Sequence, residues 1–203
     1  MIFFARCPLV GRYSKTLAEK AAWAFVGSER AVHAASGHRL ELATILPSFI
    51  IGPPRTPRVD SESLANMAAL LEGRLPPRGD TPMVDVRDAA AAHVAAAELP
   101  GAAGSRFIVS TPRPVTRAQV MEVVADAQPD LDLLRSESPD AARAPQPVIF
   151  CSRTADRLDV RWTAPEDSLR DMASAMVRQG VVEAKHRAGA ALDPAPKHVA
   201  TEL

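Results

Sequence analysis

The chain contains 203 residues, and 47% of them are hydrophobic, so it can form one or two domains with a substantial core. Its 24 Lys and Arg are balanced by 24 Asp and Glu, which removes the general attraction of a basic chain to nucleic acid or membrane. We therefore expect neither partner. No apolar run approaches the roughly 20 residues of a bilayer span, and two isolated cysteines fit reduced thiols. These features predict a cytoplasmic protein.

Residues 14–33 are predicted to form the first helix. Ala, Leu and Lys dominate this stretch, and apolar residues recur four apart, which places them on one face. The sequence of residues 16–19, TLAE, also fits a capping box, in which case the helix begins at Thr16. The two readings differ only in where the helix starts.

A nearly continuous apolar run follows at residues 40–51. Continuous rather than alternating apolarity is typical of a strand that is buried on both faces, as in a parallel sheet. Pro47 interrupts this run and argues against a central strand from end to end. We therefore expect the strand to stop near Leu46 and the chain to turn into a loop.

The rest of the sequence predicts an alternation of helices and short strands. In chain order we expect a helix over 61–72, an extended piece over 83–86, a helix over 89–98, a strand over 106–110, and helices over 116–127 and 164–180. Gly73 is predicted to end the first of these helices, and Asp88 and Thr116 are predicted N-caps. Residues 128–147 are expected to be irregular, and the tail after residue 186 disordered. This order fits an α/β chain.

Four stretches carry motifs: SKTLAEKAAW at 14–23, ATILPSFIIGP at 43–53, VDVRDAAAAH at 84–93 and EDSLRDMA at 166–173. In this order they resemble the extended short-chain dehydrogenases/reductases, specifically the dihydroflavonol reductase and cinnamoyl-CoA reductase group. The resemblance implies an α/β fold, the C-terminal part of a Rossmann-type parallel sheet with a small α/β substrate-binding lobe. It divides the chain into 1–127, the rest of the Rossmann-type domain interleaved with the lobe, 128–183, the C-terminal lobe and last helix, and a disordered tail over 184–203.

The resemblance also implies an activity, the NADPH-dependent reduction of a carbonyl or aldehyde, with NAD as an alternative cofactor. In this family a Tyr gives a proton to the carbonyl oxygen, and a Lys four residues later lowers the Tyr pKa and contacts the nicotinamide ribose. Lys15 occupies the position of that Lys, and Pro47 and Ser48 resemble the loop beside the nicotinamide. The partner implied is a small-molecule carbonyl substrate, flavonoid-like, phenylpropanoid-like or a small ketone, and a homo-oligomer is allowed for.

The sequence departs from the family pattern at two places. Gly11 stands four residues before Lys15, where the Tyr is expected, and the nearest tyrosine is Tyr13. In a regular helix Tyr13 is about 200° around the axis from Lys15, so they share a site only if the first turn is irregular. No Gly-x-x-Gly-x-x-Gly turn for the cofactor pyrophosphate occurs in the sequence. Three hypotheses remain: an N-terminally truncated reductase, an inactive paralogue that acts as a binding or regulatory module, or a chain that completes its sheet with a partner or a second copy.

Other polar residues have simpler explanations than catalysis. Asp85, Arg87 and Asp88 are expected to cap a helix and form a local ion pair rather than a catalytic carboxylate pair. The five histidines show no metal-ligand spacing, so no metal site is predicted. Trp23 and Trp162 are expected in the core or at a domain interface.

Overall fold

The computed structural model describes residues 8–28, 31–32, 36–75, 80–112, 114–135 and 155–182. Its helices are α1 (Pro8–Val26), α2 (Glu62–Leu71), α3 (Val86–Glu98), α4 (Arg117–Ala127), the 3-10 helix η3 (Ala155–Leu158) and α5 (Pro165–Arg178). Its strands are β1 (Thr44–Pro47), β2 (Phe49–Ile51), β3 (Met83–Asp85) and β4 (Arg106–Val109). The α/β class is confirmed. The predicted tail and most of the predicted irregular stretch lie outside the described residues.

Helix α2 begins one residue after the predicted start at Ser61, and α4 begins directly after Thr116, its predicted N-cap. The Ser61 side chain accepts a hydrogen bond from the backbone of Leu64, and Gly73 follows α2 with a φ of 75°, a conformation that favours glycine. Thr116 and Gln119 form a capping box in which each side chain bonds the other residue's backbone N–H. Local sequence signals therefore suffice to place both helices.

The start of α1 differs from both predictions. The helix begins at Pro8, and proline is well tolerated in a first turn because its missing N–H has no helical partner there. The capping-box prediction at residues 16–19 is wrong because these residues lie in the helix interior, and the Glu19 side chain bonds the sheet instead. The helix also ends earlier than residue 33, and Arg39 donates to the carbonyl oxygen of Val26 at 3.1 Å.

Strand β1 ends at Pro47, close to the predicted stop near Leu46, but the loop predicted after it is wrong. Strand β1 pairs in parallel with β4, and after Ser48 the chain continues as β2, which pairs in parallel with β3. Thr44 donates its backbone N–H to Ser105, directly before β4, and Ser48 donates to Val109 of β4, each at 3.0 Å. Because successive backbone N–H groups of a strand point to opposite edges, an N–H at Pro47 would point away from β4, and its absence costs no bond in that ladder.

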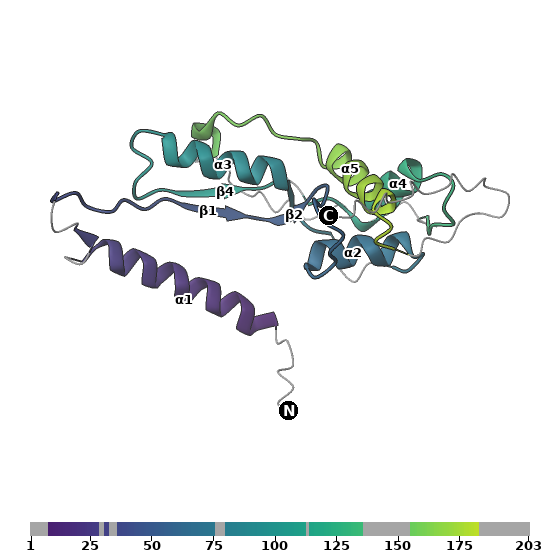
Figure 1. Ribbon diagram of the computed structural model, residues 1–203, viewed down its shortest axis with the longest axis horizontal. Helices are drawn as coiled ribbons and strands as arrows, with labels where there is room; N and C mark the ends of the chain where they lie inside the picture. The colour runs from purple at the N-terminus through teal and green to yellow at the C-terminus, as the bar shows by residue number, and fades with distance from the viewer. Residues whose placement is uncertain are drawn as a thin grey trace, which may run out of the picture.

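Buried hydrophobic side chains form two clusters among the described residues. The sheet cluster contains residues of α3, β4 and η3, with Phe107, Val109 and Ala92 fully buried. The helical cluster contains residues of α2, α4 and α5, with Leu71 and Met176 fully buried. Figure 1 shows α3 along one face of the β1–β4 pair, α1 on the other face, and α2, α4 and α5 gathered beyond β2. Within the described ranges, every helix is too short or too polar to serve as a bilayer span.

Candidate functional site

Helix α1 carries the two candidate catalytic residues, Tyr13 and Lys15. The helix runs without a break from Pro8 through both, so the irregular first turn that would bring them together is not formed. Helical geometry therefore places their side chains about 200° apart around the axis. Tyr13 is 66% exposed and Lys15 is also exposed. The structure does not bring the two side chains to one face.

Glu19 fastens α1 to the sheet. Its carboxylate accepts hydrogen bonds from Arg106 at 2.7 Å and 3.0 Å, from Trp23 at 3.2 Å and from Thr44 at 3.3 Å. Hydrogen bonds from Arg106 and Trp23 lower the pKa of the Glu19 carboxyl to about 2. Lys15 lies one turn before Glu19 on the same side of the helix. Helix α1 and strand β1 run in opposite directions (Figure 1), so the turn of α1 that precedes Glu19 lies on the side of the carboxyl end of β1.

Pro47 and Ser48 stand at that carboxyl end, between the two strand pairs. Pro47 is exposed, while Ser48 uses its backbone N–H to bond Val109. The Ser48 hydroxyl oxygen is buried and has no hydrogen-bond partner among the described residues. A buried hydroxyl without a partner is unfavourable, so this atom can take a polar group of a ligand. Ligands of open α/β sheets bind outside the carboxyl ends of the strands, which is where Ser48 lies.

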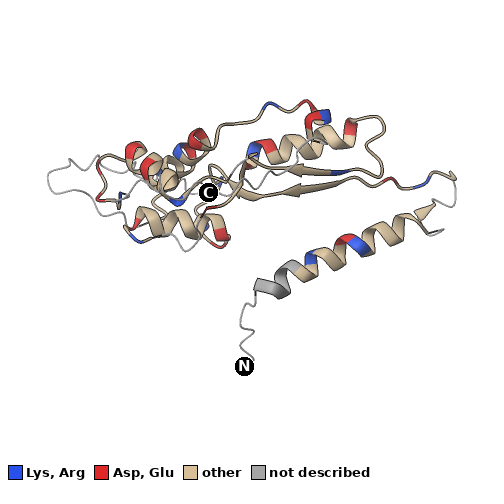
Figure 2. Cartoon of the chain, turned by 180° about the vertical axis from the view of Figure 1, so that it is seen from behind, with Lys and Arg blue, Asp and Glu red and all other residues tan. Residues whose placement is uncertain are grey.

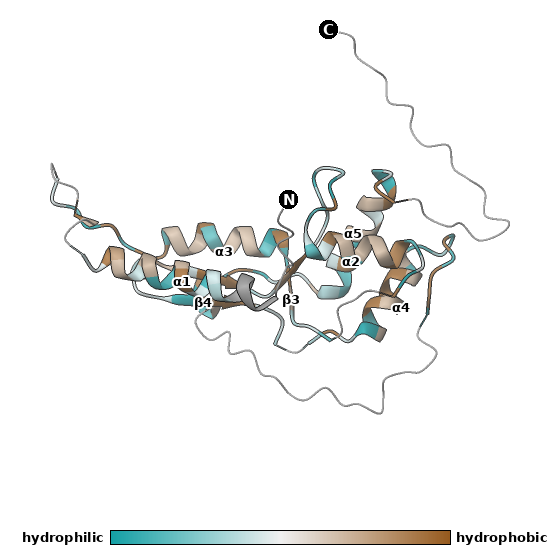
Figure 3. Cartoon of the chain, turned by 90° about the horizontal axis from the view of Figure 1, so that it is seen from below, coloured by the Kyte–Doolittle hydropathy of each residue, from teal (hydrophilic) through white to brown (hydrophobic). Residues whose placement is uncertain are grey.

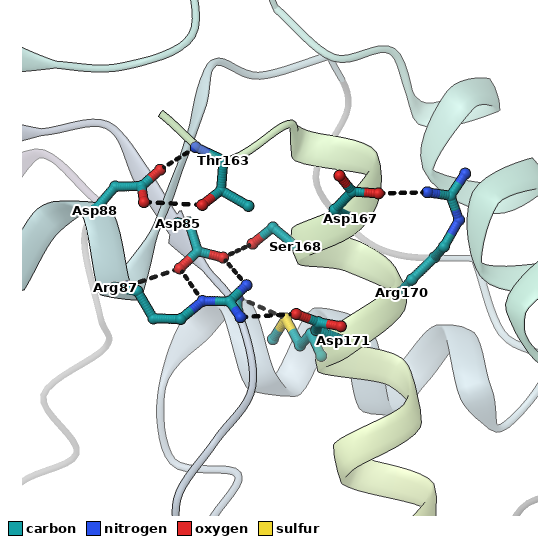
Figure 4. A network of polar contacts seen from close by, with 10 residues as sticks. Asp85, Arg87, Asp88, Thr163, Asp167, Ser168, Arg170 and Asp171 are labelled. Carbon is teal, nitrogen blue, oxygen red and sulfur yellow. Dashed lines mark hydrogen bonds and ion pairs between the residues drawn. The ribbon is translucent and has the colours of Figure 1, made fainter. Parts of the chain in front are cut away.

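Asp85 is the centre of a polar network that joins β3, α3 and α5 (Figure 4). Its side chain is fully buried, and it accepts hydrogen bonds from the Arg87 backbone at 2.7 Å and from the Arg87 guanidinium at 2.9 Å and 2.8 Å. Ser168 of α5 donates its hydroxyl to the same carboxylate. Burial raises the pKa of the Asp85 carboxyl, but the hydrogen bonds from Arg87 and Ser168 outweigh burial and hold it below its usual value.

The expected capping and ion pair are therefore confirmed, but the N-cap of α3 is Asp85 rather than Asp88. Asp88 instead accepts hydrogen bonds from the backbone and hydroxyl of Thr163, at 2.6 Å and 2.9 Å, and so fixes the segment before α5. Arg87 also reaches Asp171 of α5 at 2.8 Å. The sequence did not reveal these links to Ser168, Thr163 and Asp171, because the residues lie 75 to 84 positions apart.

Two further features shape this end of the sheet. A cavity of about 420 Å³ opens where β3 and β4 end, and its lining includes Asp85, Ser110, Thr111 and Trp162. Trp162 is 41% exposed, so of its two predicted places, the core and a domain interface, the core is wrong, whereas Trp23 is half-buried against Glu19. Figure 2 shows acidic and basic residues interspersed along the helices that surround the sheet. The lining of the cavity therefore includes the ring of Trp162 and several polar groups, and the cavity lies at the edge where ligands of such sheets bind.

Comparison with known proteins identifies the architecture. No family model matches the chain. Dihydroflavonol 4-reductase of Zea mays is 31% identical over 168 residues, 81% of this chain and 43% of the relative, and cinnamoyl-CoA reductase 1 of Arabidopsis thaliana is 27% identical over 170 residues, 83% and 46%. The structure of Gre2 from Candida albicans in complex with NADPH is 25% identical with a TM-score of 0.68, covering 86% of this chain and 53% of that one.

The fold and these neighbours define a Rossmann-type reductase architecture, of which the described elements are the later strands and helices. The relatives are reductases of the dihydroflavonol and cinnamoyl-CoA type, which confirms the resemblance to the extended short-chain dehydrogenases/reductases that the motifs predicted. It spans about half the length of the curated relatives it matches.

Proposed function

We propose that the chain forms the substrate-side part of an NADPH-dependent carbonyl reductase. The observation that carries this proposal is the unpartnered, buried hydroxyl of Ser48, at the carboxyl end of β1 and on the side toward which Lys15 lies. The substrate is a small ketone or aldehyde, of the flavonoid or phenylpropanoid kind that the relatives' names suggest. The proposed substrate lobe is built from α5 and the helices that pack on it, and the division of the chain at residue 127 stays a prediction.

The residues that we assign to the cofactor would all contact the nicotinamide end of NADPH. We assign Lys15 to the ribose, and Pro47 and Ser48 to the nicotinamide, where the Ser48 hydroxyl gains the partner that it otherwise lacks. Lys15 supports this role because an ammonium group donates up to three hydrogen bonds to hydroxyl oxygens. When bound, NADPH supplies the hydride. No glycine-rich turn for the pyrophosphate occurs in the sequence, so we expect this chain to bind NADPH at best weakly.

A second candidate function is a binding or regulatory module without turnover. The observation in its favour is the regular helix through Gly11, Tyr13 and Lys15. Gly11 has no proton to give, and Tyr13, the remaining candidate proton donor, faces away from the side of Lys15. A reductase that lacks a proton donor beside the carbonyl oxygen loses a factor of about 10² to 10⁴ in rate. We therefore expect no measurable reduction of aldehydes by this chain.

Saturation-transfer NMR with NADPH tests the cofactor assignment, because it detects weak binding and separates the two ends of the molecule. We expect saturation to reach the nicotinamide protons, to fall in Lys15→Met and Ser48→Ala, and to persist in the control Lys20→Met on another face of α1. Stronger saturation of the adenine protons, or equal signals in Lys15→Met and Lys20→Met, contradicts the assignment. Micromolar affinity in a calorimetric titration contradicts the expected weak binding.

A turnover assay tests whether this chain reduces carbonyl compounds by itself. NADPH oxidation is followed with a series of aldehydes and ketones, in the wild-type chain and in Tyr13→Phe. We expect no turnover in either protein, because the helix places no proton donor on the side of Lys15. Turnover that disappears in Tyr13→Phe would show that Tyr13 donates the proton, and it would rule out the second candidate function.

A further inference from the structure

A second cavity lies within the helical cluster, and none of the proposed cofactor residues lines it. It is lined by residues of β2, β3, α2, α4 and α5 and by Thr81, and eight of its twelve lining residues are apolar: Phe49, Ile51, Met67, Leu70, Met83, Val120, Leu169 and Met172. Its volume is about 40 Å³. One water needs roughly 10–15 Å³ on this scale, so the cavity has room for about three to four non-hydrogen atoms, the size of a carboxylate with one carbon behind it.

Arg117, the first residue of α4, lines this apolar cavity. Its backbone N–H is bound by Asp80 at 3.1 Å, but its guanidinium Nε is buried and has no hydrogen-bond partner. Among the described residues, no carboxylate forms an ion pair with this guanidinium at 4.0 Å or less. A buried donor on a charged group without an acceptor is unfavourable, and an anion in the cavity removes that cost.

The other polar groups of the cavity suit the same ligand. Asn66 of α2 is only 9% exposed and carries an amide that can donate to a second oxygen, and Ser63 and Thr81 add hydroxyl groups. A guanidinium presents its N–H groups as a planar fork that matches the two oxygens of a carboxylate. The lining therefore offers donors for one carboxylate beside apolar volume for a short tail.

We propose that this cavity binds a short-chain aliphatic carboxylate. The carboxylate pairs with Arg117, and the tail packs against Met67, Leu70 and Met172. The proposal goes beyond the carbonyl-reducing function and does not depend on it, because none of Lys15, Pro47 and Ser48 lines this cavity. It adds an anion site inside the helical cluster.

Calorimetric titration of the full chain with sodium acetate tests the proposal, with a separate titration of sodium chloride at matched concentration as the control. Acetate places one carbon atom behind its carboxylate, which is the size that the cavity admits. We expect saturable binding of acetate and at least tenfold weaker binding of acetamide, which has the same shape without the charge. Equal affinity for the two compounds, or no saturable acetate binding at tens of millimolar, overturns the proposal.

Arg117→Met locates the site, with Arg178→Met in the exposed last turn of α5 as the matched control. Methionine keeps an unbranched side chain and a similar helix propensity. We expect acetate binding to be lost in Arg117→Met and unchanged in Arg178→Met. Arg117→Lys keeps the charge but not the fork, and is expected to bind at least fivefold more weakly than the wild type, which gives a second variant if Arg117→Met does not fold. Wild-type binding in a folded variant at Arg117 overturns the proposal.

Discussion

Replacing Asp85 by alanine is expected to be strongly destabilising, because one side chain serves three elements. The change removes the N-cap of α3, which costs about 1 kcal/mol. It leaves the fully buried hydroxyl of Ser168 without its acceptor, which costs about 1–3 kcal/mol. It also breaks the ion pair with Arg87, whose side chain is 48% exposed, so that loss is screened to about 1 kcal/mol.

Together these losses amount to about 3–5 kcal/mol, in the range found for breaking a buried ion pair. A domain of this size has about 5–15 kcal/mol of stability, so Asp85→Ala removes a large share of it. Asp171→Ala is the matched control, because it removes the other partner of Arg87 from a pair that is about half exposed at both ends. We expect it to cost less than about 1 kcal/mol.

Urea unfolding followed by far-UV circular dichroism measures both variants. Asp85→Asn keeps a side-chain oxygen for the N-cap and is expected to lose only about 1–3 kcal/mol, which keeps the comparison usable if Asp85→Ala does not fold. The double variant Asp85→Ala/Ser168→Ala is expected to regain about 1 kcal/mol of unfolding free energy relative to Asp85→Ala, because the buried hydroxyl that lacks an acceptor is removed. The reasoning is refuted if Asp85→Ala and Asp171→Ala lose the same stability within about 0.5 kcal/mol.

Three further predictions concern other positions. Gly52→Ala is expected to lose about 2 kcal/mol or more in urea unfolding, because φ is 127° and an added Cβ would lie 2.9 Å from Val86 Cγ1; an unchanged midpoint would contradict this. Phe107→Ala, at a fully buried position, is expected to lower the free energy of unfolding by about 3–5 kcal/mol, and a loss under 1 kcal/mol would argue against the described core. The Glu19 carboxyl has its pKa lowered from 4.5 to about 2, so its stabilisation is complete above pH 4.5 and is lost as the pH falls toward 2. Tryptophan fluorescence should report release from Arg106 with a midpoint near pH 2, and the same transition in Glu19→Gln would assign it elsewhere.

The predictions that succeeded rest on signals within one turn of a helix. Thr116, the predicted N-cap, accepts a hydrogen bond from the backbone three residues ahead, so the sequence alone places the start of α4. Asp88 was predicted as the N-cap of α3, but Asp85 caps this helix and Asp88 accepts hydrogen bonds from Thr163, which lies 75 residues further along. A contact between residues so far apart in the sequence leaves no pattern in the sequence around either residue.

Pro47 shows the same limit for a strand. The sequence reveals a proline in an apolar run, but not which side of the ladder it faces, and that side depends on the register with β4. The candidate site was only partly predictable for a related reason. The motifs identify Lys15 and Ser48, whereas the buried state of the Ser48 hydroxyl is set by packing around the junction of two strand pairs.

The extended run from Thr44 to Ile51 is shared between two separate strand pairs, and each pair leads into a different hydrophobic cluster. Figure 3 shows hydrophobic backbone segments beside β3, between α3 and the helices α2 and α5. The run is held by β4 on one side of Ser48 and by β3 on the other. The residue that we assign to the nicotinamide therefore lies at the point of the chain where the two hydrophobic clusters meet, so its position depends on the packing of both.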